Sequence, residues 1–171
     1  MPSTVSIAVV AVASLAAASD VATRRIPNWL TLGAAAVALA YHVAVGGWVG
    51  FALAAAGWLV GTALFFPFFA LGGMGAGDVK LVGALGAWLG PLGAVQVAIA
   101  AALAGGLVAV IVMLRARYLR TAFANLRLLF THWGVNGIGA LPELTLAQGS
   151  GPRLAYAVPI LIGTLGVLWW L

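Results

Sequence analysis

Residues 49–78 read VGFALAAAGWLVGTALFFPFFALGGMGAGD and contain one charged side chain, that of Asp78. The apolar part, Val49–Leu71, is 23 residues long. A helix needs roughly 20 such residues to cross the hydrocarbon core of a bilayer. Residues 72–77 then form a glycine-rich connection that leads to the carboxylate. The segment therefore predicts a membrane-spanning helix followed by a turn and an acidic side chain.

The composition of the whole chain agrees with this local pattern. Hydrophobic residues make up 64% of the 171 residues, and charged residues make up 6%. Soluble domains carry about 25% charged residues, so a soluble globule, a disordered tail and a coiled coil are excluded. We predict one membrane domain over residues 1–171. The lipid bilayer is its expected partner, and its oligomeric state is left open.

The basic balance of the chain suggests membrane orientation rather than nucleic-acid binding. The net charge of +5 and the pI near 10.9 come from 8 basic residues against only 3 acidic ones. A shortage of acids, not an abundance of bases, produces this value. We expect no nucleic-acid partner.

Six apolar runs lie between the charged residues and the glycine or proline breaks. They are approximately Val5–Ser19, Trp29–Val45, Val49–Leu71, Val79–Leu89, Leu92–Leu114 and Leu154–Leu171. The expected fold class is all-α, a polytopic membrane protein with six transmembrane helices. The run Val79–Leu89 spans only about 16 Å as a helix. Either the bilayer thins there, or the glycine-rich loop before Asp78 enters the membrane.

The positions of the basic residues predict the orientation. With six crossings, all eight Lys and Arg residues fall on one side of the membrane. Cytoplasmic loops carry the excess of Lys and Arg, so this side is expected to be cytoplasmic and both termini to lie outside. The first run is interpreted as a retained helix rather than a signal peptide, because its first basic residue, Arg24, follows the apolar part.

The long connection between Arg115 and Arg153 contains a helical pattern of period three to four. Its apolar positions are Leu119, Ala122, Phe123, Leu126, Leu129, Phe130 and Trp133, and its polar positions are Arg117, Arg120, Arg127 and Thr131. Such a pattern is typical of an amphipathic helix on an anionic membrane surface. We predict one cytoplasmic amphipathic helix here, either as an anchor or as a substrate-docking element. Gly134–Pro152, which includes Glu143, is predicted to be a loop.

The three acidic residues are Asp20, Asp78 and Glu143. Asp20 ends the first run and Asp78 begins the fourth, so both are expected at the same membrane boundary and could meet. Two carboxyl groups that meet in a low dielectric share a proton, which leaves one base and one acid. This is the equipment of an aspartic protease.

Three other interpretations of these acids remain open from the residues alone. Asp20 could pair with Arg24 one helical turn later, and Asp78 could cap the N-terminus of a helix. Both could also belong to an ion or proton pathway. We expect no metal site and no cofactor, because the chain lacks cysteine and because His42 and His132 are predicted to lie away from the acids.

Two motifs resemble those of the prepilin peptidases. DVATRRIPNWLT, residues 20–31, resembles their first catalytic motif, and GAGDVKL, residues 75–81, resembles the second, the Gly-x-Gly-Asp motif. Residues 156–160, YAVPI, resemble the last helix of the family. The similarity extends over most of the chain and is poor over residues 115–153.

This resemblance implies a six-helix intramembrane aspartic endopeptidase of a bacterial or archaeal cytoplasmic membrane. It would remove the short basic leader from type IV pilin-like precursors at the cytoplasmic face. Asp20 and Asp78 match the catalytic aspartates. The larger members also carry Cys-x-x-Cys motifs and N-methylate the product. This cysteine-free chain resembles the short form found in tight-adherence (Flp) pilus systems, so we expect cleavage without methylation.

The remaining motif residues have candidate roles in binding substrate. Gly75 and Gly77 are expected to let the loop beside Asp78 take positive φ and approach an extended peptide closely. Arg24, Arg25 and Lys80 are either orientation signals or contacts to an acidic residue of the substrate. Other glycines, such as Gly105 and Gly106, are predicted to serve close helix packing.

Two functions from other classes remain as alternatives. A small proton- or cation-coupled transporter would use Asp20 and Asp78 to carry ions. A non-catalytic assembly subunit would tolerate neutral residues at both positions.

Overall fold

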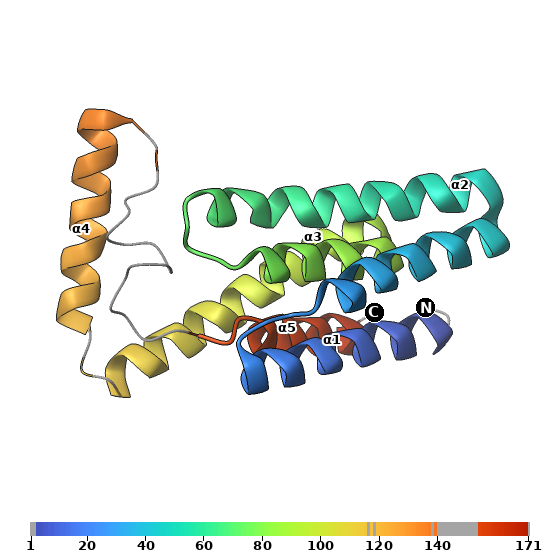
Figure 1. The fold of residues 1–171 in the computed structure, drawn as a ribbon, viewed down its shortest axis with the longest axis horizontal. Coiled ribbons are helices and arrows are strands. Elements are labelled where there is room, and N and C mark those ends of the chain that lie inside the picture. Colours follow the sequence, from blue (N-terminus) through green and yellow to red (C-terminus); the bar gives the residue numbers. More distant parts are fainter. Residues whose placement is uncertain (1–2, 116, 118, 138, 140–153, 171) are drawn as a thin grey trace.

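The computed structural model of the chain is all-α (Figure 1). It describes residues 3–115, 117, 119–137, 139 and 154–170. Within this part of the chain the helices are α1 (Ser3–Thr23), α2 (Asn28–Ala70), α3 (Ala76–Arg115), α4 (Leu119–Asn136) and α5 (Ala157–Trp170). The predicted all-α class is confirmed. α1, α2 and α3 are long and apolar enough to cross a membrane, and α5 is a shorter apolar helix.

α2 and α3 each fold back on themselves at a glycine. Gly47 has φ 58° and ψ −143°, and Gly90 has φ 74° and ψ −179°. Both φ values lie where a side chain is strained and glycine is not. Figure 1 shows α2 running to one end of the bundle and returning. The breaks predicted between the second and third runs and between the fourth and fifth are therefore present, as reversals inside α2 and α3.

Glycines let the returning segments pack backbone against backbone. A Cβ added at Gly57 would overlap the carbonyl oxygen of Gly86, and one at Gly86 would overlap that of Gly57. A Cβ at Gly61 would lie 2.6 Å from the carbonyl oxygen of Val82. Small residues allow this close approach between apolar helices. α2 and α3 are thus held together at positions where larger side chains do not fit.

α3 and α5 are joined in the same way, and α1 completes the core. A Cβ at Gly163 would lie 2.5 Å from the backbone nitrogen of Ala101. The four largest fully buried side chains come from α1, α3 and α5: Leu81, Leu85, Ile160 and Val9. The bundle therefore encloses the first turns of α3 between its other helices.

The reversals place the helix ends in two groups. The end of α1, both ends of α2 and α3 and the beginning of α5 lie at one end of the bundle (Figure 1). The reversals at Gly47 and Gly90 lie at the other, where the His42 ring is 3.2 Å from the carbonyl oxygen of Trp88. His42 is therefore remote from the end that carries both aspartates, as predicted. The helix connections place every described Lys and Arg at the aspartate end or in the segment that follows α3.

α4 lies across the aspartate end of the bundle and stands apart from it (Figure 1). The predicted helix is confirmed, but it continues to Asn136, so its last turn lies where a loop was expected. Its apolar side chains Phe123 and Phe130 are exposed. Leu126 is exposed as well, whereas the other apolar positions of the pattern are half-buried: Leu119, Ala122, Leu129 and Trp133. Glu143, Arg153 and most of the predicted loop lie outside the described residues.

Close packing at Gly86 can be tested with one methyl group. Gly86→Ala is expected to lower the thermal unfolding midpoint in detergent, because the methyl overlaps the Gly57 carbonyl and overpacking costs about 1–3 kcal/mol. Gly166→Ala is the matched control, since a Cβ there has no neighbour within 4 Å. It should be neutral or stabilising by up to about 1 kcal/mol. Equal midpoints for the two variants would contradict the packing described.

Candidate functional site

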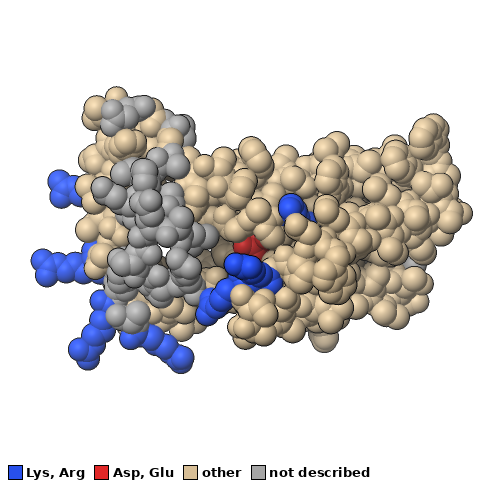
Figure 2. All heavy atoms as spheres, in the orientation of Figure 1, with Lys and Arg blue, Asp and Glu red and all other residues tan. Residues whose placement is uncertain are grey.

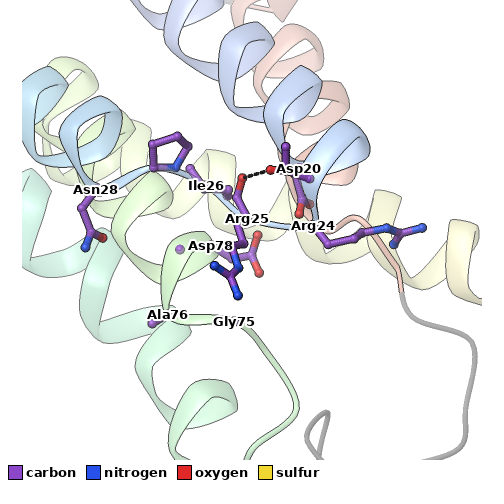
Figure 3. Close-up of a pocket in the computed structure, with 11 residues that line it drawn as sticks. Asp20, Arg24, Arg25, Ile26, Asn28, Gly75, Ala76 and Asp78 are labelled. Atoms are coloured by element: carbon purple, nitrogen blue, oxygen red, sulfur yellow. Dashed lines mark hydrogen bonds between the residues drawn. The ribbon is translucent and has the colours of Figure 1, made fainter.

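Asp20 and Asp78 line one pocket of about 500 Å³ at the aspartate end of the bundle (Figure 3). Asp20 comes from the last turn of α1 and Asp78 from the first turn of α3. Figure 2 shows an acidic side chain within a hollow bordered by basic side chains. The other residues that line the pocket are Thr23, Arg24, Arg25, Ile26, Pro27, Asn28, Gly75, Ala76 and Gly77. Residues of both motifs therefore meet in space.

Asp20 is held in place by the beginning of α5. Its side chain is 8% exposed, and its Oδ2 accepts a hydrogen bond from the backbone N–H of Ala157 at 3.2 Å. Ala157 is the first residue of α5. The N-terminus of a helix presents free N–H groups and a positive dipole end, so it favours a carboxylate. This contact joins the first and last helices at the pocket.

Asp78 occupies a different environment. It is the third residue of α3 and not its N-cap, so the N-cap interpretation is wrong, although Asp78 does lie in the first turn, where the helix dipole favours a carboxylate. Its backbone N–H donates to the carbonyl oxygen of Gly75 at 3.2 Å. Its Oδ1 is buried and accepts no hydrogen bond from any described residue. Because buried polar atoms are nearly always hydrogen-bonded, this oxygen is suited to a bound water or peptide.

Gly75 and Gly77, which precede Asp78, leave space for neighbouring side chains because they have no side chain of their own. A Cβ at Gly75 would lie 3.1 Å from Oδ2 of Asp78, and one at Gly77 would lie 3.0 Å from Cβ of Ile26. Within the loop only Gly72 has positive φ, at 76°. The expectation of positive φ is therefore wrong for Gly75 and Gly77, and the close approach of a substrate peptide to these glycines stays a prediction.

Two hydroxyl groups at the end of α1 fix the opposite wall of the pocket. Oγ of Ser19 donates to the carbonyl oxygen of Arg25 at 2.8 Å, and Oγ1 of Thr23 is 3.2 Å from the same oxygen. Arg24 turns the chain with φ 55°. Ser19 and Thr23 were not among the predicted site residues, although hydroxyl residues near a helix end signal contacts of this type.

Lys80 does not line the pocket. Its Nζ donates to Oδ1 of Asn28 at 2.9 Å, which ties the beginning of α3 to the beginning of α2. Arg24 and Arg25 do border the pocket. Of the three basic residues predicted to contact substrate, Arg24 and Arg25 thus lie at the pocket. Lys80 lies outside the pocket and instead binds Asn28. Within the described ranges, no cluster of three or more His, Asp or Glu side chains could hold a metal ion.

Comparison with known proteins agrees with this geometry. A sequence model of the type IV leader peptidase family matches residues 7–110, which include both motifs. The chain belongs to the type IV leader peptidase family. Neither a comparison with curated proteins nor one with solved structures finds a match. The predicted resemblance to the prepilin peptidases is confirmed, and peptidase activity is the general activity of this family.

Cleavage of a leader-bearing precursor can test whether the absence of a side chain at Gly75 keeps the Asp78 carboxylate in position. Gly75→Ala places a methyl 3.1 Å from Oδ2 of Asp78 and should displace the carboxylate. A misplacement of about 1 Å can cost about 100-fold in rate, so kcat should fall by about 10- to 100-fold. Gly73→Ala is the control, because its nearest contact would be an ordinary 3.5 Å to Phe68. Equal rates for the two variants would show that the distance from residue 75 to Asp78 is unimportant.

Proposed function

We propose that this leader peptidase is an intramembrane aspartic endopeptidase that removes the short basic leader from type IV or Flp prepilin-like precursors. Asp20 and Asp78 are its catalytic pair. The observation that carries the proposal is the shared pocket, into which α1 and α3 bring two of the three acidic residues of the chain. In a chain so poor in charge, two buried carboxyl groups at one site indicate function.

The mechanism uses the two carboxyl groups in different protonation states. The carboxylate takes a proton from a water molecule, whose oxygen attacks the carbonyl carbon of the scissile peptide bond. The protonated partner donates a hydrogen bond, and then its proton, to the developing oxyanion. As the tetrahedral intermediate breaks down, the C–N bond cleaves and the amine takes a proton from the pair, while one hydroxyl group of the intermediate returns its proton to the carboxylate and becomes a carbonyl. Water is consumed, and the two carboxyl groups return with one proton between them.

The same proposal includes a membrane topology. The six apolar segments of α1, α2, α3 and α5 cross the bilayer as one domain, and the aspartate end faces the cytoplasm. The positive-inside rule supports this, because seven described basic residues lie at that end or beyond it in the α4 segment: Arg24, Arg25, Lys80, Arg115, Arg117, Arg120 and Arg127. α4 lies on the anionic leaflet with Phe123 and Phe130 directed into it.

The pocket wall suggests how substrate is held. The loop with Gly75 and Gly77 leaves room for an extended peptide beside Asp78, and Arg24 and Arg25 supply positive charge for an acidic residue of the mature segment. Lys80 is proposed as a positioning residue that acts through Asn28 rather than through substrate. The proposal covers cleavage alone, because these 171 residues contain no cysteine. We do not extend it to the N-methylation seen in the Cys-x-x-Cys-bearing members that the motifs resemble.

The catalytic pair can be tested by removing each charge. Asp20→Asn and Asp78→Asn should each abolish cleavage of a precursor while the purified protein stays folded. The double variant should be little worse than either single one, because groups that act as a unit are non-additive. Glu143→Gln is the control, since it removes the third acid of the chain. Loss of the leader is measured by mass spectrometry.

The pH profile provides a second readout of the same pair. Activity should fall on the acidic side, where both groups are protonated and no base remains, and on the alkaline side, where both are ionised and no acid remains. If a folded asparagine variant cleaves at near the unmodified rate, the aspartic mechanism is wrong. Ion flux that depends on either acid, without cleavage, would favour the transporter.

The topology can be tested with single cysteines in this cysteine-free chain. Trp48→Cys and Val135→Cys suit the test, because these side chains are 79% and 83% exposed and belong to opposite ends. Gly47 and Gly137 are avoided, since both have positive φ. An impermeant thiol reagent added to oriented vesicles should label the two cysteines from opposite faces. Labelling of both from the same face would contradict the proposed crossings.

A further inference from the structure

The second half of α3 carries a single polar side chain, that of Gln96. This half runs from the reversal at Gly90 to Arg115, and every other residue between them is apolar. The Gln96 side chain is half-buried and makes no hydrogen bond with any described residue. A carboxamide group without a hydrogen-bond partner is costly in hydrocarbon. Gln96 therefore needs a partner that the described part of one chain does not supply.

Gln96 interrupts the apolar surface of the helix and does not mark its end. At 1.5 Å per residue it lies about 9 Å from Gly90 and about 28 Å from Arg115. Leu92, one turn nearer to the reversal, is exposed and apolar, so the apolar surface continues past Gln96. In the membrane topology proposed above, the carboxamide therefore lies in the hydrocarbon region.

Gln96 belongs to a stripe of seven residues, which we call the α3 seam. Their spacing alternates between four and three residues, which is the heptad spacing of helices that pack along their length. Residues of this half that the bundle buries, such as Ala94 and Ala101, lie on the opposite face of the helix. Five of the seven seam residues are exposed, and Gln96 and Met113 are half-buried. The α3 seam consists of Leu92, Gln96, Ile99, Leu103, Gly106, Val110 and Met113.

Two adjacent glycines of α3 differ in their surroundings. A Cβ at Gly105 would lie 2.7 Å from the Tyr156 hydroxyl, so the packing role predicted for Gly105 is confirmed. A Cβ at Gly106 would have no neighbour within 4 Å, so packing against another helix of the same bundle is wrong for Gly106. Glycine destabilises the middle of a helix, and in membrane helices it allows a second helix to approach closely. On the seam, Gly106 leaves room for a helix from outside the chain.

We infer that the α3 seam is a dimer interface, in which a second copy of this chain packs the same seam and the two Gln96 side chains hydrogen-bond to each other. A carboxamide has both a donor and an acceptor. Two identical groups related by a two-fold axis therefore satisfy each other reciprocally. Both copies have the same orientation in the membrane, so each seam residue faces its own counterpart. One polar residue in a heptad seam also fixes the register of the two helices.

The dimer leaves the aspartate pocket of each copy uncovered by the seam. No seam residue lines that pocket, which is formed at the first turn of α3 and not along its second half. The inference rests on the proposed crossing of the membrane by α3. It does not depend on the roles proposed for Asp20 and Asp78.

The contribution of Gln96 is tested by measuring dimerisation in lipid vesicles. Energy transfer between labelled copies is followed over a range of protein-to-lipid ratios. Gln96→Leu should weaken dimerisation by about 3- to 30-fold, the range for hydrogen bonds between membrane helices. Gln96→Asn keeps the carboxamide and should retain more dimer. Gly106→Leu should also weaken dimerisation through its bulk, whereas Gly166→Leu, which enters open space on α5, should not.

The geometry of the seam is tested with single cysteines in this cysteine-free chain. Leu103 on the seam and Leu59 on α2 are 71% and 58% exposed, and they lie at similar distances along their helices from the reversals at Gly90 and Gly47. Under mild oxidation in vesicles, Leu103→Cys should form a disulfide between copies. Leu59→Cys is the matched control and should remain monomeric.

Three results would overturn the inference. They are a monomer at every protein-to-lipid ratio, an unchanged dimerisation constant in Gln96→Leu, and equal cross-linking of the two cysteine variants, which random collision would produce. Neither measurement uses a precursor. Failure of the unmodified protein to cleave would therefore contradict the proposed function and leave the dimer interface standing.

Discussion

An apolar chain in an apolar solvent must satisfy its own backbone hydrogen bonds, and this constraint governs the whole structure. Water is not available in the hydrocarbon region to pair with a free N–H or C=O group, so only regular helices can fill it. In the part of the chain that the structure describes, the turns therefore lie where glycine permits them, at Gly47 and Gly90, or at the ends of helices. Every such turn adds a break in the hydrogen-bonding pattern, and both described acidic residues, Asp20 and Asp78, lie within one turn of a helix end.

The same constraint explains why the acids meet. A carboxylate is least costly near the membrane boundary, and the reversals inside α2 and α3 return the chain to one end. Asp20 at the end of α1 and Asp78 at the beginning of α3 are thereby brought to one pocket. The free N–H of Ala157 then supplies a hydrogen-bond donor to Asp20. A helix terminus that lipid would leave unsatisfied thus becomes part of the site.

Much of this arrangement could be predicted from the sequence. Apolar run lengths located the helical segments, the glycine and proline breaks located both reversals, and the three- to four-residue spacing located α4. The meeting of the two acids followed from a count of crossings. These predictions succeed because they depend on local composition and on whether the number of helical segments between two residues is odd or even.

The contacts between helices could not be predicted in the same way. α2 and α3 are apolar on every side, so the sequence does not indicate which face of each helix packs against a neighbouring helix. Nothing in the sequence pairs Gly57 with Gly86, or Lys80 with Asn28. Gly105 and Gly106 are adjacent and identical, yet a Cβ at one would touch a tyrosine and a Cβ at the other would have no neighbour within 4 Å. Such differences depend on the rotation of helices about their axes, which sequence periodicity does not specify here.

The central claim, that the acids of α1 and α3 share one site, is tested most directly by cross-linking. The chain has no native cysteine, so Asp20→Cys combined with Asp78→Cys gives a single pair of thiols. In folded protein, a short bifunctional thiol reagent should join them within one chain. Asp20→Cys combined with Trp48→Cys, at the far end of the bundle, should not be joined. If the first pair reacts no better than the second, the two acids do not share a pocket and the account is contradicted.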